Sequence, residues 1–209
     1  MRVQSLLYVV LFLSLAPGAS AGLITYEVTV NTSSISGTAG SLDFNFNPGL
    51  LVTQAANLRI LNFASNGTLS GSPSLTGDVS GALPGTLTFD NGTGFNDYFG
   101  GFTYGSTLSF DVLLYGPALS SPNGTATSGS TFAFSMFSDS AGTIPALTTD
   151  LVDGFAATLD VNLDGKTTVT NFSPVTGISP VPEPGGVVLI GTAVALLGAL
   201  LSFRRRRRA

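Results

Sequence analysis

The sequence contains no cysteine, no histidine and no tryptophan among its 209 residues. Without histidine or cysteine, the chain cannot build a Ser-His-Asp or Cys-His nucleophilic site, a Cys/His zinc or haem site, or a disulfide framework. The absence of tryptophan also removes the ring on which lectin platforms usually rely for stacking sugars. Carboxylate chemistry is then the remaining route to catalysis. We nevertheless expect that the protein has no enzymatic activity.

Basic residues are scarce between the two ends of the chain. Arg2 stands at the start and five of the eight basic residues stand at the end, which leaves Arg59 and Lys166 for the middle. Residues 22–184 hold twelve acidic residues, so their net charge is −10. Nucleic acids and anionic lipid surfaces are therefore poor partners, whereas calcium or a neutral polymer suits this surface.

The first 21 residues have the pattern of a secretory signal peptide. Arg2 is followed by an apolar run at residues 6–16 and by the small-residue triplet Ala19-Ser20-Ala21. This pattern predicts cleavage between Ala21 and Gly22. The apolar run is too short for a permanent membrane anchor, so we expect an exported protein.

The C-terminal end has the pattern of a transmembrane helix. Residues 185–203 are uncharged and apolar, and they are long enough to cross a bilayer as a helix. Under the positive-inside rule, the arginines that follow act as a stop-transfer signal and keep the preceding chain outside the inner membrane. These arginines are Arg204, Arg205, Arg206, Arg207 and Arg208.

The tetrapeptide Val181-Pro182-Glu183-Pro184 stands directly before the predicted helix. Its two prolines favour an extended, exposed segment of the kind that a protease binds. The tetrapeptide, the apolar helix and the arginine run, combined with the signal peptide, resemble the PEP-CTERM sorting signal of exopolysaccharide-producing Gram-negative bacteria.

The resemblance covers about the last thirty residues and implies a processing route. In that family a membrane-embedded protease, the exosortase, recognises the tripartite tail and removes the helix during delivery to the cell surface. By resemblance, Pro182, Glu183 and Pro184 are the recognition element, and the helix holds the protein in the inner membrane until processing. The expected domains are thus a signal peptide at 1–21, an ectodomain at 22–178 and a sorting signal at 179–209.

The ectodomain shows period-two alternation bounded by turn residues, which is typical of β-strands. Asn-Gly and Asp-Gly dipeptides and several prolines separate the alternating runs. We predict an all-β fold, an antiparallel β-sandwich of the jelly-roll or Greek-key type with eight to ten strands. The predicted strands lie at residues 24–30, 42–46, 58–63, 85–89, 108–114, 132–137, 155–161 and 167–172.

One internal motif matches the opening of a calcium-binding loop. Asp160, Asn162 and Asp164 precede Gly165 in the pattern D-x-N-x-D-G, in which three side-chain oxygens converge on one Ca²⁺ ion. The twelfth position is Asn171, where the loop requires a bidentate carboxylate. A β-hairpin closed by Asp164-Gly165 is the favoured alternative.

A second segment is a candidate sugar-binding loop. Residues 90–104 combine aromatic rings with Asn, Asp and Gly, and Asp97, Tyr98 and Tyr104 are the candidate sugar-binding residues. The favoured alternative is that the rings belong to the core and the glycines make turns.

The sequence predicts an exported protein that passes through the inner membrane and reaches the cell surface or the extracellular polysaccharide matrix. The resemblance of the tail implies exosortase and polysaccharide as partners and a structural, biofilm-associated role. A carbohydrate- or calcium-binding adhesion module is the first alternative. A secreted hydrolase that uses a carboxylate pair is the second.

Overall fold

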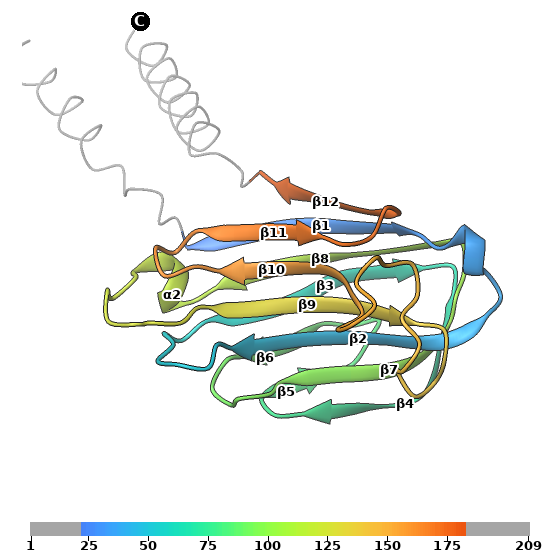
Figure 1. The fold of residues 1–209 in the computed structure, drawn as a ribbon, viewed down its shortest axis with the longest axis horizontal. Helices are drawn as coiled ribbons and strands as arrows, with labels where there is room; N and C mark the ends of the chain where they lie inside the picture. The colour runs from blue at the N-terminus through green and yellow to red at the C-terminus, as the bar shows by residue number, and fades with distance from the viewer. Residues whose placement is uncertain (1–21, 183–209) are drawn as a thin grey trace, which may run out of the picture. The chain divides into compact units, whose positions relative to one another are not determined.

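The computed structural model describes residues 22–182, which form an all-β domain (Figure 1). Two short helical turns, η1 and α2, are the only helical elements in this range. The elements in chain order are β1 (Leu23–Asn31), η1 (Ser33–Ile35), β2 (Ala39–Pro48), β3 (Asn57–Ser65), β4 (Thr68–Thr76), β5 (Val79–Gly81), β6 (Leu87–Asp90), β7 (Asp97–Thr103), β8 (Thr107–Tyr115), α2 (Pro117–Ser120), β9 (Ser130–Phe137), β10 (Phe155–Val161), β11 (Thr167–Asn171) and β12 (Thr176–Val181).

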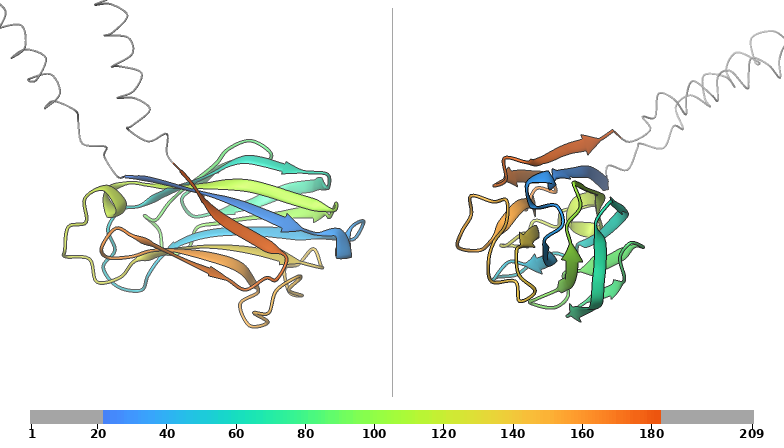
Figure 2. Two further views of the ribbon diagram at one scale, coloured as in Figure 1. Left: turned by 90° about the horizontal axis from the view of Figure 1, so that it is seen from above. Right: turned by 90° about the vertical axis from the view of Figure 1, so that its right-hand side faces the viewer.

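The twelve strands of the described range form two six-stranded antiparallel sheets. Sheet A has the order β12-β1-β8-β3-β6-β5, and sheet B has the order β11-β10-β9-β2-β7-β4. The sheets lie face to face (Figures 1 and 2), and most consecutive strands belong to different sheets. The predicted β-sandwich is confirmed at this level.

Alternation along each strand decides which side chains enter the space between the sheets. On β2, Leu42, Phe44 and Phe46 are fully buried, whereas Asp43 and Asn45 project from the opposite face of sheet B. Phe44 packs edge-to-face on Phe110 of sheet A, with the ring centroids 5.1 Å apart. Aromatic burial across the two sheets therefore forms the centre of the core.

All eight predicted strands are present, and four further strands were missed. β4, β5 and β12 lie at or near sheet edges, where half-exposed positions carry Ser, Thr, Gly and Pro rather than an apolar repeat. β7 was read as part of a loop because two glycines interrupt its aromatic residues. The predicted ectodomain boundary at residue 178 falls inside β12, because this strand pairs with β1 as far as Val181.

The loop at residues 138–154, between β9 and β10, folds over part of the outer face of sheet B (Figure 1). The Ser41 hydroxyl on that face donates to the Asp139 carbonyl at 2.8 Å. A side chain at Gly142 would meet the ring of Phe99, which lies on the same face. The loop therefore shields this part of the sheet from solvent.

We predict that Phe44→Ala lowers the free energy of unfolding by about 3–5 kcal/mol, because it removes a fully buried ring from between the sheets. Phe95→Ala is the matched control, since Phe95 is 53% exposed, and it should change stability by no more than about 0.5 kcal/mol. Urea unfolding followed by tyrosine fluorescence measures both. Equal losses in the two variants would contradict this account of the core.

Candidate functional site

The predicted processing sites lie at the two ends of the described range. Gly22 directly precedes β1, and Val181 is the last residue of β12, where it is 41% exposed and in register with Thr25 of β1. Ala21, Glu183, Pro184, the predicted helix at 185–203 and Arg204 to Arg208 lie outside the described residues. Between residues 22 and 182, neither helical element is long and apolar enough to span a membrane.

The calcium-loop motif forms the predicted hairpin between β10 and β11. The Asn162 backbone nitrogen donates to the Lys166 carbonyl at 2.8 Å, and Gly165 adopts a positive φ of 78° that favours glycine. The hairpin alternative is therefore confirmed. Calcium binding at this turn stays a prediction.

The three candidate calcium ligands each contact a different neighbour within the protein. Asp160 accepts a hydrogen bond from Thr131 on β9 at 2.6 Å, and the Asn162 amide donates to Thr168 at 2.9 Å. Asp164 forms an ion pair of 2.9 Å with Lys166, which lowers the pKa of this exposed carboxyl. In residues 22–182, no group of three or more acidic side chains is arranged to hold a metal ion.

The structure corrects the sugar-binding hypothesis for the two tyrosines. Tyr98 and Tyr104 are each 2% exposed, so neither offers a ring face to a glycan. The Tyr104 hydroxyl lies 2.8 Å from the Ser41 carbonyl and 3.0 Å from the Phe137 carbonyl, and burial raises the pKa of both tyrosines. The favoured alternative, in which aromatic rings of this segment belong to the core, holds for Tyr98, Phe102 and Tyr104.

The loop before β7 is held by a buried asparagine. Asn96 is fully buried, and its amide nitrogen donates to the Phe46 carbonyl at 2.9 Å and to the Thr93 carbonyl at 3.0 Å. Its side-chain oxygen accepts from the Asp78 backbone nitrogen at 2.8 Å. The asparagine therefore fixes the loop rather than presenting an amide to a ligand.

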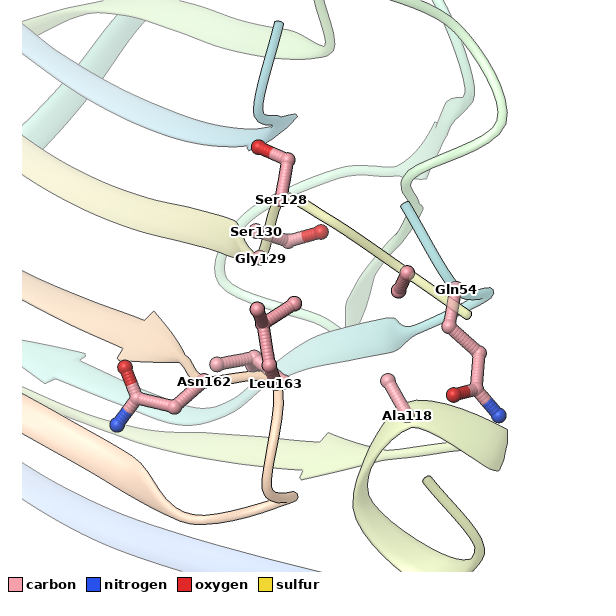
Figure 3. A pocket seen from close by; sticks show the side chains of 9 residues that line it. Gln54, Ala118, Ser128, Gly129, Ser130, Asn162 and Leu163 are labelled. Carbon is pink, nitrogen blue, oxygen red and sulfur yellow. The ribbon is translucent and has the colours of Figure 1, made fainter. Parts of the chain in front are cut away.

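A small pocket lies where the β10–β11 hairpin meets α2 (Figure 3). Its volume is about 10 Å³, roughly the room for one water molecule. This pocket is too small for a sugar ring. Its lining residues are Gln54, Ala118, Ala126, Ser128, Gly129, Ser130, Val161, Asn162 and Leu163.

The most unusual polar group of the domain lies on the outer face of sheet B, at Asp43, Asn45 and Asp97. Asp43 and Asn45 are on β2, and Asp97 at the start of β7 stands directly opposite Asn45. The Asn45 amide nitrogen donates to the Asp43 carboxyl at 2.6 Å. The Asp43 and Asp97 carboxyl groups also hydrogen-bond to each other. We call these three residues the Asp43–Asp97 cluster.

Burial favours the protonated form of Asp43 within the Asp43–Asp97 cluster. Burial raises the pKa of Asp43 to about 8, and the neighbouring Asp97 adds to this shift, whereas the hydrogen bond from Asn45 opposes it. Burial also raises the pKa of Asp97, and its hydrogen bond with Asp43 opposes that shift. Two carboxyl groups can hydrogen-bond only when one of them carries a proton, and the raised pKa of both groups favours a proton held between Asp43 and Asp97.

The sequence hypotheses included Asp97 but missed Asp43 and Asn45. A signal for the missing pair was present, because the alternation of β2 places Asp43 and Asn45 on one face of a strand whose other face is strongly apolar. The pairing of β2 with β7 depends on long-range register, however, and no local pattern gives it.

Comparison of the chain with protein-family models, with curated proteins and with solved structures found no match in any of the three.

We predict that Asp43 makes the stability of the domain fall as the pH rises from 5 to 8 in buffers without divalent cations. The folded cluster retains a proton that an unfolded aspartate, with its ordinary pKa of 3.8, has released. The free energy of unfolding should therefore fall by about 1.4 kcal/mol per pH unit and level off above pH 8.

Asp43→Asn should flatten this slope, because the amide donates to Asp97 without titrating. Asp111→Asn, on sheet A, is the control and should keep the slope. Urea unfolding at each pH gives the values. An unchanged slope in Asp43→Asn would contradict the assignment of the proton.

Proposed function

We propose that this chain is an exported protein that an exosortase sorts to the cell surface or the extracellular polysaccharide matrix, where it has a structural, biofilm-associated role. The proposal starts from the tail Val181-Pro182-Glu183-Pro184, the apolar segment 185–203 and the terminal arginines. These parts, in this order, resemble the PEP-CTERM sorting signal, in which the apolar segment 185–203 corresponds to the transmembrane helix of that signal.

The observation that carries the proposal is the extent of the folded unit. The compact unit runs from Gly22 to Val181, so it begins at the predicted signal-peptide cleavage site and ends at the first residue of the predicted sorting motif. Removal of both flanking segments leaves every strand of the two sheets intact. A domain with these boundaries is suited to release from the membrane by one cleavage before Gly22 and a second cleavage after Val181.

The pairing of the first and last strands supports the same route. Thr25 and Val181 are opposite each other on β1 and β12, so the two predicted cleavage sites emerge at the same end of sheet A. Pro182 has no backbone N–H and cannot extend the β12 ladder. The recognition element Pro182-Glu183-Pro184 therefore follows directly after the last paired residue, Val181, which is a position suited to recognition by a protease.

We also assign the sandwich to the Greek-key or jelly-roll type. The chain passes from one sheet to the other at most of its connections, and few consecutive strands pair with each other. This alternation between sheets is typical of jelly rolls and other Greek-key sandwiches.

We predict that the mature protein from its native host begins at Gly22 and ends between residues 182 and 186. Intact mass spectrometry of the membrane and the medium, analysed separately, tests this directly. Added mass at the new C-terminus would identify attachment to a surface acceptor.

Replacement of Pro182, Glu183 and Pro184 by alanine should keep the whole chain in the membrane, because the recognition element is removed. Ser179→Ala is the matched control, since Ser179 is an exposed residue of β12 outside the motif, and it should be processed normally. A wild-type product that keeps its arginines and stays in the membrane would make this protein a permanently tethered periplasmic domain.

A further inference from the structure

The Asp43–Asp97 cluster contains two buried oxygen atoms that accept no hydrogen bond from the described residues. These atoms are Oδ1 of Asn45 and Oδ1 of Asp97. Asn45 is 8% exposed, and its amide is held by Asp43 on its own strand while the residue stands opposite Asp97. The Asn45 side-chain oxygen has no hydrogen-bond partner, although the nitrogen of the same amide is bound to Asp43. A buried acceptor oxygen without a partner costs free energy, so both atoms require a donor or a cation.

The described residues supply no basic side chain to this cluster. Arg59 and Lys166 are the two basic residues between residues 22 and 182. Arg59 lies over the ring of Tyr115 on sheet A, at 5.3 Å from the ring centroid, and Lys166 forms its ion pair with Asp164. Two adjacent carboxyl groups thus lie on a strongly acidic domain without a basic partner.

Neighbouring strands add further oxygen atoms on the same face of sheet B. Ser135 of β9 stands opposite Asp43, and Thr76 of β4 stands opposite Asp97. Carboxylate, amide and hydroxyl oxygens are hard ligands, and no sulfur or nitrogen ligand is among them.

We propose that Asp43, Asp97 and Asn45 form a Ca²⁺-binding site on the outer face of sheet B. The two carboxyl groups supply the negative charge, and the oxygens of Asn45 and Asp97 that lack a hydrogen-bond partner supply further ligands. Ca²⁺ takes six to eight oxygen ligands in flexible geometry, so hydroxyl groups and water complete the shell. This site is separate from the D-x-N-x-D-G turn, whose three candidate ligands lie on the β10–β11 hairpin.

The site has a structural consequence within the sheet. A cation bound between Asp43 and Asp97 links β2, in the middle of sheet B, to β7, the neighbour of edge strand β4. We therefore expect bound Ca²⁺ to stabilise the half of sheet B that ends at β4.

The test is calcium titration of the full chain, purified in detergent and stripped with EDTA, at pH 8. Isothermal titration calorimetry should give one bound Ca²⁺, and the melting temperature should rise when Ca²⁺ is added. Asp43→Asn and Asp97→Asn should each weaken the affinity by about tenfold or more, because each removes a charged ligand. Asp160→Asn and Asp164→Asn change the D-x-N-x-D-G turn, so they distinguish the two candidate sites and should leave Ca²⁺ binding at the Asp43–Asp97 cluster unchanged. Asp111→Asn, on β8 of sheet A, is the matched control.

A gain-of-function variant keeps the test decisive when a loss variant fails to fold. Asn45→Asp adds a third carboxylate at the same position, so it should tighten Ca²⁺ binding and make the unliganded domain less stable.

Several results would overturn the assignment. The first is that the wild type shows neither binding heat nor a shift in melting temperature when Ca²⁺ is added. The second is that the protein binds Mg²⁺ in place of Ca²⁺. The third is that Asp160→Asn or Asp164→Asn abolishes Ca²⁺ binding whereas Asp43→Asn retains it. The first result would leave the cluster as a carboxyl pair that shares a proton, and the last would move the site to the hairpin.

Discussion

The domain depends on the burial of one face of each sheet against the other. The core consists largely of aromatic and aliphatic side chains that alternate with polar residues along each strand, as Phe44 and Phe46 do with Asp43 and Asn45. Because the chain has no disulfide bonds, this packing and the backbone ladders hold the two sheets together. The same alternation leaves a row of polar side chains on the outer face of sheet B.

The fold could be predicted where the alternation is strong. β2, β8 and β9 combine large apolar residues with period-two spacing, and all three were found from the sequence. β4 and β12 were missed because an edge strand packs with fewer neighbours and tolerates Ser, Gly and Pro. β7 was missed for another reason, since its aromatic residues also fit a sugar-binding loop.

The candidate sites were harder to predict because their chemistry depends on long-range register. Asp43 and Asp97 are far apart in the sequence, and only the pairing of β2 with β7 brings them together. The D-x-N-x-D-G motif is local, and its hairpin alternative was correct because turn residues act on the nearest backbone. Tyr98 and Tyr104 show the converse difficulty, since composition alone cannot tell a ring in the core from a ring on the surface.

The pairing of β1 with β12 has a consequence for the order in which the domain can fold during the export that we propose. Of the described strands, β1 would leave the translocation channel first, and its edge next to β12 could not be covered until residues 176–181 had followed. Until then the domain exposes an unpaired strand edge, on which another chain can form a ladder. If the protein is exported as we propose, sheet A would be completed only when the entire domain had crossed the membrane, and a chain stalled in transit would be prone to aggregation.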